Sequence, residues 1–298
     1  MCWSGPASLA VASVGVGGSL WARSKGVPDA RWRTLLYFTG MELLQAVTYI
    51  VIDQCGLPSN IWLTRLSYAH IAFQPFFINL LGLSFVPKEI AARVKPYVLA
   101  ACALGASIML AKMFVPSPSM ACDPATLPLC GADTCSYHGS WHIAWRLYLS
   151  TLDNTYLSYF LPAFIVPLFY GSWRWVVYHM LVGPVPAFFM SPNKDEVPAI
   201  WCLMSIGFLL ALHLKPIEHW MESPLRHPAL GRAADYRRWA QTFGGACAFV
   251  VLYLAVKFAG GVEVRELAPL YWVVGLSAPL AAWFYVRSDR EKRAGLAT

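Results

Sequence analysis

The chain has 298 residues, of which 57% are hydrophobic and 13% charged, and its mean hydropathy is +0.49. Soluble domains carry about 25% charged residues, so this composition excludes an ordinary soluble protein and predicts an integral membrane protein. The formal net charge is +7, but the chain has no room for a folded soluble module with a basic face, which excludes nucleic acid as a partner.

Apolar segments of the length that a helix needs to cross a bilayer, about 20 residues, recur along the whole chain. In chain order they are Pro6 to Trp21, Thr34 to Asp53, Ile61 to Val86, Tyr97 to Val115, His142 to Tyr170, Trp173 to Met190, Val197 to Leu214, Trp239 to Gly260 and Leu267 to Val286. The sequence therefore predicts an all-α integral membrane protein of about nine transmembrane helices in a single polytopic domain, residues 1–298. Within it we expect a core of about seven helices in residues 1–233 and two additional helices in residues 234–298.

Lys and Arg gather in alternate loops, and such loops face the cytoplasm under the positive-inside rule. The basic loops are residues 22–33, 87–96 and 215–238, together with the tail from residue 287. This alternation predicts an N-terminus outside and a C-terminus in the cytoplasm, in a bacterial inner membrane, with the lipid bilayer as a partner. The sequence does not define the oligomeric state.

Five of the eight cysteines fall at the outer face in this topology: Cys2, Cys55, Cys122, Cys130 and Cys135. Disulfides persist in oxidising compartments such as the periplasm, and MACDPATLPLCGADTCSYHG has the spacing of a small cross-linked lid. We expect Cys2 to pair with Cys55, because both lie at outer helix ends, and one further bridge to form within residues 122–135. Spacing alone does not fix the pairing.

Polar side chains at bilayer depth are the strongest functional signal, since they are costly there and usually face the bundle interior. In the second segment, Glu42 and Gln45 lie three residues apart on one helical face. In the third, His70 and Gln74 lie four residues apart within the aromatic run SYAHIAFQPFF. The alternative to a functional site is a set of interhelical hydrogen bonds, which applies most to the two glutamines.

The fifth segment carries the longest polar stripe, HGSWHIAWRLYLSTLDNTYLSY. On a helix, the residues that share one face of this segment are His138, His142, Arg146 and Asp153, with Asn154 directly after. Asp153 is then level with Glu42 and His70, so we expect these three side chains to converge on one buried polar site. Such a cluster suits a cation, a proton relay, a divalent metal or a polar substrate.

His138 and His142 have HxxxH spacing, which on a helix can chelate a metal from one face. His70 and Glu42 would add ligands where the helices converge. However, the GSW between the two histidines supplies no general base of the kind found in zincin motifs, and contact with an aromatic outer gate is the alternative role. The cofactor classes that this pattern admits are a divalent metal and haem.

Several different short motifs lie in the first half of the chain: Met-Cys-Trp at residues 1–3, ExxQ at Glu42 and Gln45, DxCG from Asp53 to Gly56, QP at Gln74 and Pro75, and HxxW at His142 and Trp145. With these motifs the chain resembles an uncharacterised family of multi-spanning membrane proteins from bacteria, algae and large DNA viruses whose members open Met-Cys-Trp. The resemblance implies a shared core that includes Cys2, Glu42, Gln45, Cys55, Gln74 and His142. It implies no activity.

Three function classes fit these observations. Movement of a small solute or ion, coupled to protons, is favoured because polar residues lie beside helices that the prolines of FLPAFIVPLFY and LVGPVPAFF should kink. The second class is a membrane-embedded, metal-dependent enzyme acting on a lipid-soluble substrate, in which Glu42, His70, His142 and Asp153 are ligands or acid and base groups. The third is a binder of haem, quinone or pigment.

Overall fold

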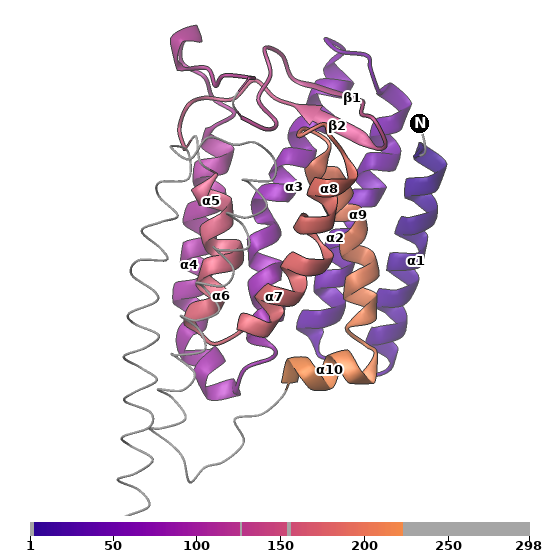
Figure 1. Ribbon diagram of the computed structural model, residues 1–298, viewed down its shortest axis with the longest axis vertical. Helices are drawn as coiled ribbons and strands as arrows, with labels where there is room; N and C mark the ends of the chain where they lie inside the picture. Colours follow the sequence, from indigo (N-terminus) through magenta and orange to yellow (C-terminus); the bar gives the residue numbers. More distant parts are fainter. Residues whose placement is uncertain (1–2, 126, 154–155, 223–298) are drawn as a thin grey trace, which may run out of the picture.

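In the computed structural model, the residues described are 3–125, 127–153 and 156–222. They form a mostly helical bundle that is covered at one end by a lid of loops and two short strands (Figure 1). Two segments predicted to cross the membrane, 239–260 and 267–286, lie outside the described residues, as do Cys2 and Asn154.

Four long helices come first: α1 (Gly5–Ser24), α2 (Asp29–Thr48), α3 (Pro58–Leu83) and α4 (Lys88–Ala111). Proline at the first turn of α1 and of α3 fits a helix start, because the first N–H groups of a helix have no internal partner. A short 3₁₀ turn, η1 (Tyr49–Val51), extends α2. Close packing joins α1 to α2, since a Cβ atom on Gly15 would lie 2.2 Å from Thr39 Oγ1.

The later helices are shorter and interrupted. They are α5 (Leu157–Phe160), the π-helical turn η3 (Leu161–Ile165), α6 (Val166–Phe169), α7 (Trp173–Val182), α8 (Pro184–Met190), α9 (Val197–Ala211) and α10 (Lys215–Glu222). The predicted kinks are confirmed, because the π-helical turn contains Pro162 and the break between α7 and α8 falls at Gly183, directly before Pro184.

Three helices are long and apolar enough to cross a membrane: Asp29–Val51, Pro58–Leu83 and Lys88–Ala111. The prediction of nine such helices is not supported, since the described part of the chain holds these three candidates and no more. Two further apolar helices, Leu157–Phe169 and Val197–Ala211, are shorter than these candidates. The all-α class is also too strict, because the lid contains a small sheet.

The predicted fifth segment is helical only from Leu157 onward, because its first part belongs to the lid. There β1 (Cys135–His138) pairs antiparallel with β2 (Ile143–Arg146), and His138 stands opposite Ile143. The expected helical stripe through His138, His142 and Arg146 is therefore wrong, and so is the helical HxxxH pair. Apolar runs this short do not distinguish a strand from a helix by periodicity, and the Gly-Ser pair at residues 139–140 supplies the turn of a hairpin.

Two disulfides fasten the lid. Cys122 pairs with Cys130, which confirms the bridge expected within residues 122–135. Cys55 pairs with Cys135 and not with Cys2, so that predicted pairing is wrong. The hairpin rests on the start of α3, where the Asn60 side chain accepts the N–H of Ser136 and donates to its carbonyl oxygen, and these contacts bring Cys135 to Cys55.

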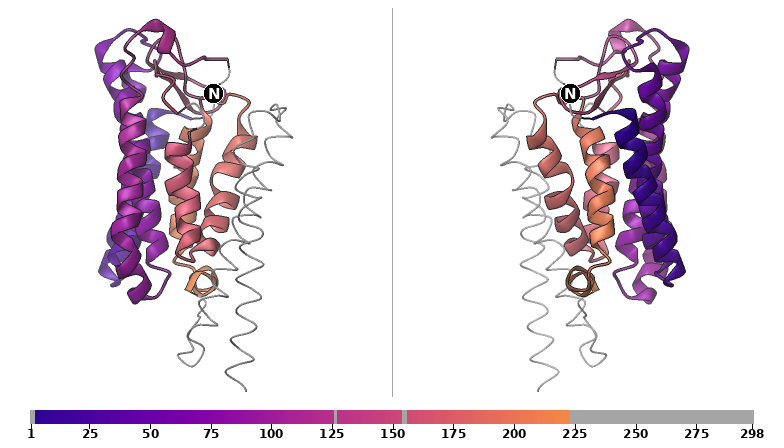
Figure 2. Two further views of the ribbon diagram at one scale, coloured as in Figure 1. Left: turned by 90° about the vertical axis from the view of Figure 1, so that its left-hand side faces the viewer. Right: turned by 90° about the vertical axis from the view of Figure 1, so that its right-hand side faces the viewer.

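The two ends of the bundle differ in charge. The lid and the N-terminus lie at one end, and α10 lies across the other (Figures 1 and 2). The end that carries α10 holds most basic residues of the described chain: Arg23, Lys25, Arg31, Arg33, Lys88, Arg93, Lys95, Arg174 and Lys215. At that end the buried Arg31 pairs with Glu218 of α10 at 2.7 Å.

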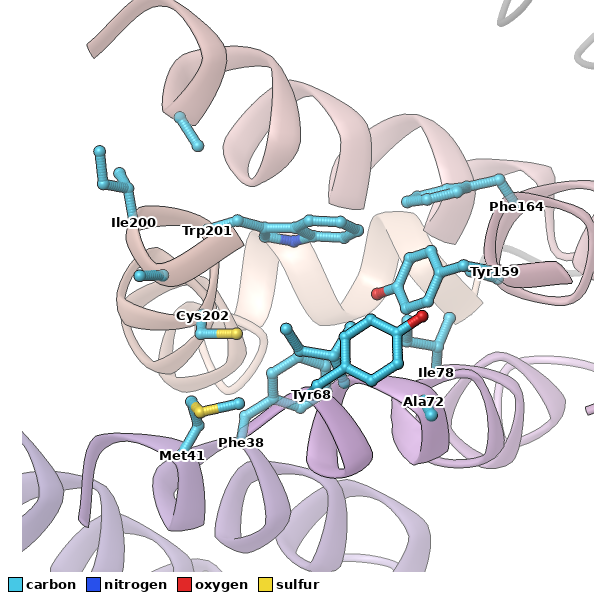
Figure 3. Close-up of a cluster of buried hydrophobic side chains, with 14 of the residues drawn as sticks. Phe38, Met41, Tyr68, Ala72, Ile78, Tyr159, Phe164, Ile200, Trp201 and Cys202 are labelled. Atoms are coloured by element: carbon cyan, nitrogen blue, oxygen red, sulfur yellow. The ribbon is translucent and has the colours of Figure 1, made fainter. Parts of the chain in front are cut away.

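The apolar core lies where α2, α3 and α9 meet the segment from α5 to α7. Figure 3 shows Phe38, Tyr68, Tyr159 and Trp201 within this core, with the thiol of Cys202 beside them. This packing fixes the helices that carry the polar side chains described next.

Candidate functional site

Glu42 and Gln45 lie one helical turn apart on α2, and both are fully buried. Each has two polar side-chain atoms, and none of these four atoms has a hydrogen-bond partner. A buried polar atom left unpaired costs about 1–3 kcal/mol, so such atoms are uncommon in folded proteins and point to a role other than stability.

His142 comes to this pair from the lid. It ends the hairpin loop, and its side chain is fully buried, with Nε2 3.9 Å from Glu42 Oε1. Nε2 has no hydrogen-bond partner, whereas Nδ1 lies 3.1 Å from the hydroxyl of Tyr49. Glu42, Gln45, Tyr49 and His142 together form what we call the buried polar site.

Two tryptophans cover the imidazole of His142. The ring of Trp3 lies 5.2 Å from it, and the ring of Trp141 lies edge-on at 5.9 Å. The Trp3 indole N–H donates to Ser8 of α1, which ties the start of the chain to this cover. The apolar rings shield the imidazole on these sides, while its two nitrogens face Tyr49 and Glu42.

Glu196 holds the loop that carries His142. This glutamate is fully buried in the loop between α8 and α9, and both of its carboxylate oxygens accept hydrogen bonds. Its four donors are the backbone N–H groups of Ser140, Trp141 and His142 and the hydroxyl of Ser191. A Cβ atom on Gly139 would lie 2.6 Å from the Glu196 carboxyl carbon, so the loop approaches this closely only because residue 139 is glycine.

The neighbouring Asp195 fastens the rest of the lid to the same loop. Its carboxylate accepts the N–H of Leu129 at 2.7 Å and the hydroxyl of Tyr137 at 3.1 Å, and its carbonyl oxygen accepts the N–H of Trp145. Asp195 and Glu196 were not predicted from the sequence. The available signal was two adjacent acids, directly before an apolar helix, in a loop predicted to lie outside.

A shallow apolar groove of about 490 Å³ leads from the surface to Tyr49. Its lining residues are Gly5, Pro6, Leu9, Ala46, Tyr49, Ile50, Ile52 and His138. At its rim, the His138 ring and backbone N–H both contact the carboxylate of Asp53. Tyr49 is thus the residue through which the buried polar site meets this groove.

The contact between Asp53 and His138 predicts an acid-sensitive lid. Burial raises the pKa of Asp53, but the backbone N–H and ring of His138 outweigh burial and hold that pKa below its ordinary value of 3.8. Because the pKa of Asp53 is lower in the folded state, the contact stabilises the fold at pH values above the unfolded-state pKa. This stability is lost as the pH falls through the folded-state pKa. Because the pair is partly exposed, we expect its acid-dependent share to be at most about 1 kcal/mol. Thermal unfolding between pH 6 and pH 3 should show a smaller acid loss in Asp53→Asn than in the natural protein, and equal losses would refute this role.

His70 lies apart from the buried polar site, at the seam between α2 and α3. Its Nε2 is 2.9 Å from the carbonyl oxygen of Tyr37, and its ring stacks on the Tyr37 ring at 4.1 Å. Gln74, one turn further along α3, accepts the hydroxyl of Tyr159 and donates to the Cys202 thiol. Figure 3 shows Tyr159 and Cys202, the two partners of Gln74, in the apolar core.

Asp153 and Arg146 occupy positions in the lid and not in a membrane helix. The Asp153 carboxylate accepts the N–H groups of Leu157 and Ser158, and so caps the start of α5. Arg146 forms an ion pair with Asp133 at 2.6 Å on the lid surface. The three side chains expected to converge, those of Glu42, His70 and Asp153, thus have separate sets of contacts, and the ionisable group beside Glu42 is His142.

The predicted metal ligands are divided in the same way. Glu42 and His142 are neighbours, whereas His138 contacts Asp53 and His70 contacts Tyr37. Within residues 3–125, 127–153 and 156–222, no group of three or more His, Cys, Asp or Glu side chains is placed to hold a metal ion.

Comparison with models of protein families gives a match. A family model described as "Family of unknown function (DUF5765)" covers residues 6–222, which includes the whole buried polar site, the lid and α10. No curated protein and no solved structure matches the chain.

Proposed function

The chain belongs to this family of unknown function, DUF5765, and the membership brings no activity with it. From the geometry we propose that the protein is a membrane protein that moves a small solute or ion through the buried polar site. The unpartnered polar atoms of Glu42, Gln45 and His142 carry this proposal, because they form a site that is costly to keep without a ligand.

The outer surface of the bundle supports placement in a membrane. Large apolar side chains face outward along the helices, among them Leu43 and Val47 of α2, Leu66 and Phe73 of α3 and Leu104 of α4. A soluble monomer rarely exposes so many large apolar side chains along its helices, whereas lipid tails suit them. The seven helical passes from α1 to α9, with α5 to α6 and α7 to α8 each counted as one, are then the predicted transmembrane core.

Charge supports the orientation. The end that carries α10 is basic, which favours the cytoplasmic side for it, and the lid with its disulfides would then face an oxidising outer compartment. This arrangement fits a bacterial inner membrane with the N-terminus outside.

The interrupted helices supply elements that can move. The break at Gly183 joins α7 and α8, which both pack against α9, and Phe164 of the π-helical turn at Leu161–Ile165 stacks on Trp201 of α9 at 5.7 Å. Interrupted helices of this kind border the substrate sites of many transporters. We propose that a change at these interruptions alters access to the buried polar site.

Charge movement across a membrane tests the proposal over a range of candidate substrates. The protein is reconstituted into liposomes on a solid-supported membrane and exposed to steps in the concentration of H⁺, Na⁺, K⁺, small amines and amino acids. We expect a transient current for at least one of these that Glu42→Gln abolishes, because the substitution removes the carboxylate but keeps its size. The absence of any current that depends on Glu42 would contradict transport and favour a catalytic or ligand-binding role.

A further inference from the structure

We infer that the ion which this site carries is the proton, and that it enters from the outer groove through Tyr49 and His142 to reach Glu42. This inference rests on the proposed function and names its substrate. The juxtaposition that supports it is a line of three groups, with Tyr49 on the groove, His142 in the middle and Glu42 in the interior.

The first link joins the groove to the imidazole. The Tyr49 hydroxyl is 3.1 Å from His142 Nδ1. In the tautomer whose Nδ1 carries no proton, the hydroxyl donates its own proton to Nδ1. Nε2 then carries the imidazole proton, and it faces Glu42.

The second link joins the imidazole to the carboxylate. Nε2 and Glu42 Oε1 are 3.9 Å apart, which is about 1 Å too long for a hydrogen bond, and both atoms are without another partner. A small movement of either side chain, or one water between them, closes this gap. The unpartnered atoms are those that a transferred proton would occupy or leave.

The transfer balances without any other reactant. Glu42 as a carboxylate takes the proton from Nε2, Nδ1 takes the hydroxyl proton of Tyr49, and the Tyr49 oxygen regains one proton from a hydronium ion at the groove, which is left as water. The net result is one proton taken from the outer side and one new O–H bond on Glu42. The imidazole ends as the other neutral tautomer, and its single N–H proton must return from Nδ1 to Nε2, by exchange with water, before the next transfer.

The site suits a proton better than a metal ion. Hard cations such as Ca²⁺ take about 6–8 oxygen ligands, and the described residues hold no group of three acidic, histidine or cysteine ligands. The separation between His142 and Glu42 is also too small to admit an organic solute between them. A proton needs only the two facing atoms that the structure provides.

Other ionisable groups near this line have different roles. Glu196 already accepts four hydrogen bonds, so its carboxylate is occupied in holding the loop. His138 lies with its ring 6.0 Å from that of Tyr49 and is engaged by Asp53 at the groove rim. Cys202 lies on the inner side, close enough to interact electrostatically with Glu42.

Proton flux into vesicles tests the inference. The full chain is reconstituted into liposomes that contain the pH dye pyranine, and a potassium diffusion potential set with valinomycin drives protons inward. We expect flux in the natural protein, none in Glu42→Gln, and at least about a tenfold slower flux in Tyr49→Phe, since that variant lacks the hydroxyl that passes the proton. Tyr37→Phe is the matched control, because Tyr37 lies on α2, which η1 and Tyr49 extend, but its hydroxyl donates to the backbone of His70. We expect this variant to equal the natural protein, and thermal unfolding checks that each variant is folded.

Each other result overturns the inference. Equal flux in Tyr49→Phe and the natural protein would show that the proton takes another route. A Glu42-dependent current for Na⁺, K⁺ or a solute, with no proton flux, would reject the proton as substrate but retain the transport proposal. No Glu42-dependent movement of any substrate would reject both.

Discussion

Replacing Glu196 by methionine is expected to lower the free energy of unfolding by at least about 2 kcal/mol, because two of its four donors, the His142 N–H and the Ser191 hydroxyl, are buried and each costs about 1–3 kcal/mol without an acceptor. Methionine fills a similar volume, so a cavity is not the cause. Three of the donors are backbone N–H groups of the hairpin loop, and Glu196 is their acceptor. Thermal and denaturant unfolding in detergent measure the loss.

Glu89→Met serves as the control for Glu196→Met. Glu89 is exposed in the first turn of α4, and its replacement should change stability by no more than about 0.5 kcal/mol. A loss below about 1 kcal/mol in Glu196→Met would mean that the glutamate does not hold the loop, and the placement of His142 would then need another explanation.

Replacing Glu42 by methionine is expected to have the opposite effect on stability and to remove function. Both glutamates are fully buried, but Glu42 accepts no hydrogen bond. Replacing poorly paired buried ionisable groups by apolar residues of similar volume is often neutral or stabilising by about 1–4 kcal/mol, and function is the usual loss when a strained site is removed. We expect a higher melting temperature than that of the natural protein, together with loss of the substrate-driven current.

The paired measurement decides between a structural and a functional Glu42. If Glu42→Met destabilises the protein as strongly as Glu196→Met does, then Glu42 makes a stabilising interaction, and the case for a ligand site fails. If Glu196→Met lowers the free energy of unfolding and Glu42→Met raises it, packing alone does not explain the difference, because both glutamates are buried.

Periodicity and composition predicted the helical part of the fold well. Helices α1 and α3 begin and end within three residues of the predicted limits, because long apolar runs flanked by basic loops have few alternatives. Helix α2 begins five residues and α4 nine residues before the predicted start, since both first turns lie in the basic loops. A lid cross-linked within residues 122–135 was predicted, but its two strands and the bridge to Cys55 were not. Its strands are four residues long, and they are stabilised by Asn60, the disulfide between Cys55 and Cys135 and the loop that carries Asp195, all distant in sequence. Local patterns contain no information on such contacts.

The candidate site was predicted in part. Glu42 and Gln45 stood out because polar residues are rare within apolar helices, and they lie where that argument placed them, facing the interior. His142 was named for the wrong reason, since it reaches Glu42 from a hairpin and not from a helix. Tyr49 was missed because a tyrosine near a helix end is usually attributed to the interfacial aromatic belt. His70 was expected beside Glu42, but its ring contacts the backbone carbonyl oxygen of Tyr37 on α2. The sequences of two helices do not show which polar atom of the neighbouring helix a histidine will contact.

Infrared difference spectroscopy of the lipid-reconstituted protein tests most directly whether the buried Glu42 carboxyl group takes up a proton from the outer medium and releases it again. Spectra recorded between two buffer pH values resolve carboxyl groups that gain or lose a proton. We predict a carboxyl band that is present in the natural protein, absent in Glu42→Gln and altered in His142→Phe, the variant that removes its neighbour. Identical difference spectra for the natural protein and Glu42→Gln would show that this carboxyl group does not exchange protons with the medium, and would contradict the account.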